Sequence, residues 1–78
     1  MTIEEIKKKL ETTNEITFIL YSLVYIISKK DNLFYITTGI HDSHINAFNT
    51  IDDLLDNYLI YGESIRANEN RILSYNKE

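Results

Sequence analysis

The sequence predicts an α+β fold in which a three-stranded antiparallel meander is covered by helices, in the order α-β-β-β-α-α. Residues 16–38 hold most of the apolar bulk, and nearly all of it is β-branched or aromatic, which favours strands. The turn residues Asp31 and Asn32 divide this stretch, and segments with helical apolar spacing flank it. At 78 residues, the chain is expected to form one domain, 1–78.

The first helix is predicted from Thr2 to Thr12. Thr2 is a suitable N-cap, and Glu5 lies three residues later, where a capping box needs it. Thr12, Thr13 and Asn14 are poor helix formers and end the helix. Its apolar stripe repeats at helical spacing and consists of Ile3, Ile6 and Leu10.

Three strands are predicted over Ile16–Tyr21, Leu23–Lys29 and Leu33–Thr38. A helix over the first two would be apolar all round, and 78 residues can hardly bury such a helix on every side. The first turn is placed near Tyr21-Ser22, because thirteen residues are long for one strand.

The second turn leaves two registers open. A two-residue loop of Asp31 and Asn32 puts Ile27 opposite Ile36, whereas a three-residue loop puts Ile26 there. A slip of one residue exchanges the two faces of the sheet.

In either register the helices can cover one face of the sheet, and the other face keeps large apolar groups. We expect a tyrosine-rich patch there, drawn from Ile19, Tyr21, Tyr25 and Tyr35. A patch of this kind on a small protein often marks an interface.

Residues 39–49 are expected to form a loop, after which Thr50 opens a second helix. Residues 59–62 are interpreted as a helix stop at Gly62 or a short extended connection. A third helix is predicted from Glu63 to Tyr75, although its apolar positions are sparse. The stripe of the second helix consists of Ile51, Leu54, Leu55 and Tyr58.

The segment from Phe48 to Ile65, FNTIDDLLDNYLIYGESI, resembles the C-terminal part of small proteins from Gram-positive bacteria and their mobile elements. In those proteins a short meander precedes a helix and a glycine-containing step into a last helix. The resemblance extends over about Ile16 to Ile65. It implies a fold of this kind and brings no activity with it.

The composition excludes several classes of protein. Without cysteine, the chain has no disulfides, thiolate zinc sites or cysteine nucleophiles. The net charge of −4 argues against nucleic-acid binding, which needs a basic patch. No apolar run reaches the roughly 20 residues of a membrane span, and no signal peptide is visible, so we expect a cytoplasmic protein. The codon bias implied by frequent isoleucine, asparagine and lysine is typical of low-GC bacteria and their phages.

Two polar groups are candidate sites. The segment from His41 to His44 brings metal-ligand types together, but zinc needs four ligands or three plus water. We interpret it as a surface loop, with no metal, no cofactor and no catalytic residues. The second group is an acidic surface able to mimic phosphates toward a basic partner, made of Asp52, Asp53, Asp56 and Glu63.

These observations favour a non-enzymatic protein–protein interaction module that binds another protein or a second copy of itself. The expected anchors are Tyr21, Tyr25 and Tyr35, because aromatic side chains dominate interface energetics. The alternative is an acidic inhibitor of the immunity or anti-host type. A small enzyme or metal protein built around His41 and His44 ranks last.

Overall fold

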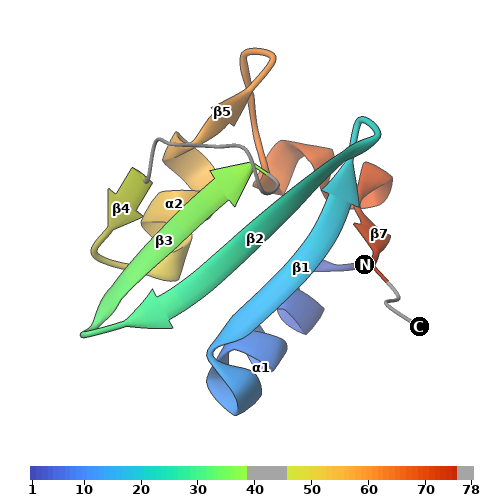
Figure 1. The fold of residues 1–78 in the computed structure, drawn as a ribbon. Coiled ribbons are helices and arrows are strands. Elements are labelled where there is room, and N and C mark those ends of the chain that lie inside the picture. Colours follow the sequence, from blue (N-terminus) through green and yellow to red (C-terminus); the bar gives the residue numbers. More distant parts are fainter. Residues whose placement is uncertain (39–45, 76–78) are drawn as a thin grey trace.

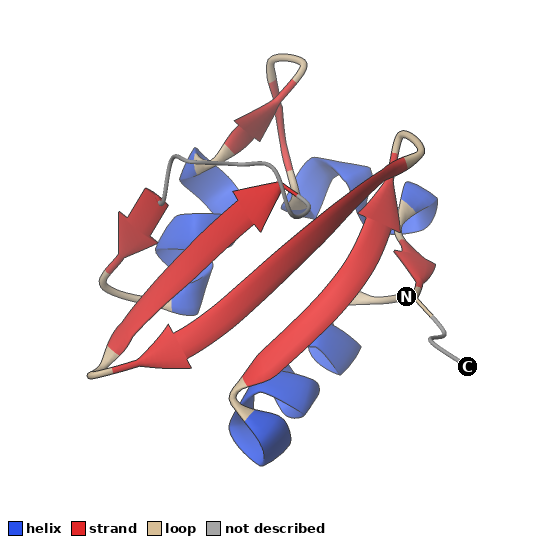
Figure 2. Ribbon diagram, viewed as in Figure 1, coloured by secondary structure: helices blue, strands red, loops and turns tan. Residues whose placement is uncertain are grey.

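The computed structural model describes residues 1–38 and 46–75, and it has an α+β architecture with an antiparallel sheet (Figure 1). The elements follow in the order α1 (Ile3–Thr13), β1 (Glu15–Leu20), β2 (Leu23–Lys30), β3 (Leu33–Thr38), β4 (Asn46–Phe48), α2 (Ile51–Asn57), β5 (Leu59–Ile60), β6 (Glu63–Ser64), the 3₁₀ helix η1 (Arg66–Arg71) and β7 (Leu73–Ser74). Figure 2 shows both α-helices and η1 on the same side of the long strands.

The sheet is larger than the sequence predicts. Its strand order is β4-β3-β2-β1-β7, so the predicted meander of β1, β2 and β3 is present at the centre. The short strands β4 and β7 extend it at the two edges, and β5 pairs with β6 in a separate hairpin. A three-stranded sheet in the order α-β-β-β-α-α is therefore wrong in strand number and in order.

Two-residue turns connect the central strands. Tyr21 and Ser22 have φ of 53° and 64°, and Asp31 and Asn32 have φ of 54° and 65°. Positive φ at both central residues is the type I′ geometry, whose twist matches that of the flanking strands. The two-residue register is confirmed, since Ile27 lies opposite Ile36.

The first helix begins and ends close to its predicted limits. The Thr2 side chain accepts a hydrogen bond from the Glu5 backbone N–H at 3.2 Å, and Glu5 Oε1 accepts one from the Thr2 N–H at 2.9 Å. The capping box is thus confirmed, and the bond from Thr2 lowers the pKa of the Glu5 carboxyl. Asn14, with φ of 61°, forms the left-handed C-cap.

The predicted third helix is replaced by other structure. Tyr61 and Gly62 have positive φ and form the tip of the β5–β6 hairpin, so the extended connection is the correct alternative for 59–62. Beyond it, η1 spans six residues and β7 then pairs with β1. The Ser64 Oγ accepts a hydrogen bond from the Ala67 N–H at 3.1 Å, just before η1, a local bond that competes with a continuous helix.

One hydrophobic core lies between the sheet and the helices. Ile6 and Leu10 of α1 and Leu54 and Leu55 of α2 are buried in it. Asn68 of η1 is the one fully buried polar side chain among the described residues. The remaining buried apolar residues are Ile3, Ile16, Phe18, Leu20, Tyr25, Ile27, Ile36, Ile60, Ile65 and Ile72.

Candidate interaction surface

The two faces of the sheet have different surroundings. The covered face packs against the helices, and its central residues are buried: Ile16, Phe18, Leu20, Tyr25, Ile27 and Ile36. The open face carries the alternate residues, on the side of the long strands away from the helices (Figure 2). It consists of Glu15, Thr17, Ile19, Val24, Ile26, Ser28, Lys30, Leu33, Tyr35, Thr37, Ala47 and Leu73.

The side chains of the open face lie in rows that run across the strands. The middle row is Thr17–Ile26–Thr37, and Ile19 lies between Val24 and Leu73 in the row above it. These side chains are half-buried, except for Leu73, which is exposed. β-Branched residues in adjacent strands pack against one another, so these threonine and aliphatic side chains form a surface with few rotamers to lose on binding.

Two of the four predicted interface residues lie on the open face. Ile19 is on β1, and Tyr35 is on β3 between Ser28 and Ala47. Both are half-buried, so each has surface left for contact with another molecule.

Tyr25 lies on the opposite face, which corrects the expectation for this residue. It is only 3 % exposed, and its ring stacks on Phe18 with the centroids 5.6 Å apart. The two-residue turn pairs Phe18 with Tyr25, so Tyr25 cannot share a face with Ile19. Burial raises the pKa of the Tyr25 hydroxyl, because the ionised form loses its hydration.

Tyr21 lies at the tip of the β1–β2 hairpin and belongs to neither face. Its hydroxyl donates a hydrogen bond to Oδ1 of the buried Asn68, and Arg71 Nη1 donates to the same oxygen at 3.2 Å. The Asn68 amide donates to the Ser64 carbonyl at 2.8 Å. Tyr21 is therefore a structural link from the sheet to η1, although 39 % of its surface remains exposed.

A second group of exposed apolar residues was not predicted. The Tyr61 ring meets the Tyr21 ring edge-on at 5.3 Å, and Tyr61 is 77 % exposed. Leu59 of the same hairpin is 59 % exposed. The sequence did contain a signal, because a glycine directly after the short apolar run that ends at Tyr61 is compatible with a hairpin tip.

The acidic residues on α2 are partly neutralised by the chain itself. Asp52 Oδ1 lies 2.8 Å from Lys7 Nζ and 2.7 Å from Arg66 Nη2. Asp56 Oδ1 lies 2.6 Å from Arg66 Nε. The hydrogen bonds from Lys7 and Arg66 lower the pKa of the Asp52 carboxyl.

The other two predicted acidic residues have different surroundings. Asp53 accepts a hydrogen bond from the Asn57 amide at 3.2 Å, and its backbone N–H donates to Oγ1 of Thr50, the N-cap of α2. Glu63 is exposed on β6, at the β5–β6 hairpin. The structure therefore joins Asp52 and Asp56 through Arg66, while Glu63 lies on a separate element.

The described residues contain no arrangement suited to metal binding. Across residues 1–38 and 46–75, no three His, Cys, Asp or Glu side chains are placed to hold an ion. The predicted loop from His41 to His44 lies outside the described residues.

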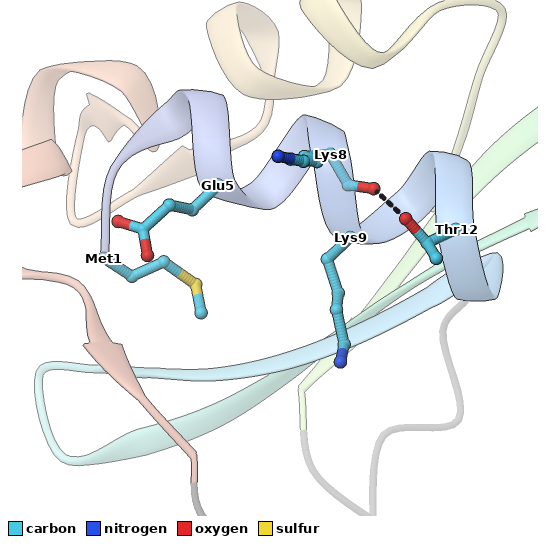
Figure 3. Close-up of a pocket in the computed structure, with 5 residues that line it drawn as sticks. All are labelled: Met1, Glu5, Lys8, Lys9 and Thr12. Atoms are coloured by element: carbon cyan, nitrogen blue, oxygen red, sulfur yellow. Dashed lines mark hydrogen bonds between the residues drawn. The ribbon is translucent and has the colours of Figure 1, made fainter.

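An open groove runs beside α1, lined by Met1, Glu5, Lys8, Lys9 and Thr12 (Figure 3). Glu5 is engaged in the capping box, and the Thr12 hydroxyl donates to the Lys8 carbonyl at 2.7 Å. The groove offers neither an activated nucleophile nor a base positioned beside one.

No described helix is both long and apolar enough for a membrane crossing. No protein-family model matches the chain, and neither a curated protein nor a solved structure matches it.

Proposed function

We propose that the protein is a non-enzymatic protein–protein interaction module, acting in the cytoplasm through the open face of its sheet. The observation that carries this proposal is the position of Ile19, Ile26 and Tyr35 on the side of the sheet that bears no helix. An extended apolar surface of this kind is a common mark of a protein interface.

Ile19 and Tyr35 are the anchors in this proposal. They lie on different strands and are both half-buried, so a partner can complete their burial at little cost in rotamer freedom. Tyr21 is not an anchor in this proposal, because it lies at the end of the sheet and its hydroxyl is already hydrogen-bonded to Asn68.

A pair of double variants tests the proposal. Ile19→Ser with Tyr35→Ser alters the open face, and Leu59→Ser with Tyr61→Ser alters a matched aliphatic and aromatic pair on the β5–β6 hairpin. Association is measured as solution mass and as cross-linked species formed with other proteins. The first variant is expected to stay folded and lose association, while the second keeps it. Association that survives unchanged in the first variant contradicts the proposal.

The second candidate is an acidic inhibitor that occupies a basic site on a nuclease or similar partner. The net charge of −4 and the exposure of Asp52, Asp53 and Asp56 on α2 support it. It ranks second because Lys7 and Arg66 already pair with two of these carboxylates. Binding that weakens steeply with salt favours the inhibitor, because an apolar contact is little screened.

A further inference from the structure

We infer that the partner of the open face is a second copy of this chain, packed sheet against sheet around a two-fold axis. The inference rests on the proposed function and names the partner. A chain of 78 residues without cysteine builds a small core and has no disulfide to strengthen it. Burial of a second sheet face by self-association supplies the missing apolar burial.

The charge of the open face favours such a partner. Among the described residues, its charged side chains are Glu15 and Lys30, which lie at the same end of the sheet with opposite sign. The face is therefore neutral, although the chain carries a net charge of −4. A basic partner finds no attraction at this face, whereas two such neutral faces meet without like-charge repulsion across the contact.

The area of the open face suits a weak, transient dimer. At ~3.4 Å per residue along a strand and ~4.8 Å between strands, β1, β2, β3, β4 and β7, with 6, 8, 6, 3 and 2 residues, give a footprint of about 400 Å² per copy. Two copies cover about 800 Å², which is the size of a weak, transient contact. We therefore expect an association that depends visibly on concentration.

The symmetry of such a dimer makes a specific prediction about Ile26. It lies on β2, the middle strand of the five, and in the middle row of the open face. In a two-fold interface the residue nearest the axis meets its own copy. When the two-fold axis lies between the sheets and runs close to the strand direction, Ala47 on the edge strand β4 is displaced from it, so its two copies lie at least about 13 Å apart sideways.

The test uses single cysteines, since the chain has none of its own. Ile26→Cys and Ala47→Cys are each treated with a short linker that joins two thiols, while the mass of the unmodified protein is measured over about a hundredfold range of concentration. We expect the mass to rise from one copy to two. Ile26→Cys should give linked dimers in at least tenfold excess over Ala47→Cys.

Three results overturn the inference. A mass that stays at one copy shows that the chain does not self-associate, and equal linking of the two variants shows random collision. A rising mass without linking through Ile26→Cys places the dimer contact elsewhere. If the protein is monomeric but its cross-linking to other proteins still requires Ile19 and Tyr35, the second copy alone is excluded and the interaction module stands.

Discussion

The two faces of the central sheet are built from the same residue types but have different roles. Phe18 and Ile19 are neighbours on β1, and Ile26 and Ile27 are neighbours on β2. Phe18 and Ile27 are fully buried beneath the helices, whereas Ile19 and Ile26 are half-buried on the open face. Residue type alone therefore does not determine burial in this sheet, because the side on which α1 and α2 pack decides it.

The largest expected difference in folding stability is between alanine variants of two neighbouring residues that lie on opposite faces of the sheet. Phe18→Ala should cost about 3–5 kcal/mol, because it leaves a cavity in the core. Ile19→Ala should cost about 1 kcal/mol, because its side chain is only half-buried. Urea unfolding followed by circular dichroism measures both, and equal losses would contradict the distinction between the faces.

The next prediction concerns Asn68 of η1, the buried polar side chain on the helix side of the sheet. Asn68→Ala should cost about 2 kcal/mol, because the Tyr21 hydroxyl and the Ser64 carbonyl both lose their partner. Tyr21→Phe removes one of these bonds and should cost about 1 kcal/mol. The denaturation midpoints of the two variants should fall in that order. An unchanged midpoint for Asn68→Ala would show that the side chain is not a link between η1 and the sheet.

A glycine in the turn between β1 and β2, which decides the residues on each face of the sheet, should raise the stability of the protein. Ser22 has φ of 64°, where a side chain is strained, so Ser22→Gly should raise stability by about 0.5–1 kcal/mol. Asn32→Gly, at φ of 65°, should gain less, because asparagine tolerates this conformation. Thermal unfolding compares the pair, and a loss of stability for Ser22→Gly would argue against the left-handed turn.

The smallest effect lies on the polar outer side of the helices. Because Lys7 and Arg66 lower the pKa of Asp52 in the folded protein, the stabilisation is present above the ordinary aspartate pKa of about 3.9 and is lost as pH falls through the folded pKa. The free energies of unfolding of the wild type and Asp52→Asn should therefore converge on acidification. A difference that stays constant with pH would contradict this role of the carboxyl.

The sequence predicted best what local chemistry decides. Thr2, Glu5 and Asn14 delimit α1 through bonds within a few residues, and Asp31-Asn32 fixes a turn. The face predicted for Tyr25 was wrong because it depends on the length of the turn at Tyr21-Ser22. These two residues are not among those that typically form a type I′ turn, so the sequence did not indicate it.

The rest of the chain depends on distant contacts that leave little trace in sequence. Strand β7 forms only by pairing with β1, and the buried Asn68 accepts its hydrogen bond from Tyr21, 47 residues away in the sequence. The contact of Tyr61 with Tyr21 and the ion pair of Arg66 with Asp52 likewise join distant segments. The helix predicted over 63–75 gave no indication of either contact. Strands of two residues cannot be predicted from hydrophobic periodicity, because two residues do not define a period.

The most direct test of the open face compares the methyl signals of Ile26 and Ile27 by nuclear magnetic resonance, with a soluble paramagnetic agent as the probe. In dilute protein we expect strong broadening of the Ile26 signal and none of the Ile27 signal, since only Ile27 is covered by helices. Protection of Ile26 should then appear as the protein is concentrated or its partner is added. Equal protection of both methyls in dilute protein would contradict the existence of an open face available for binding.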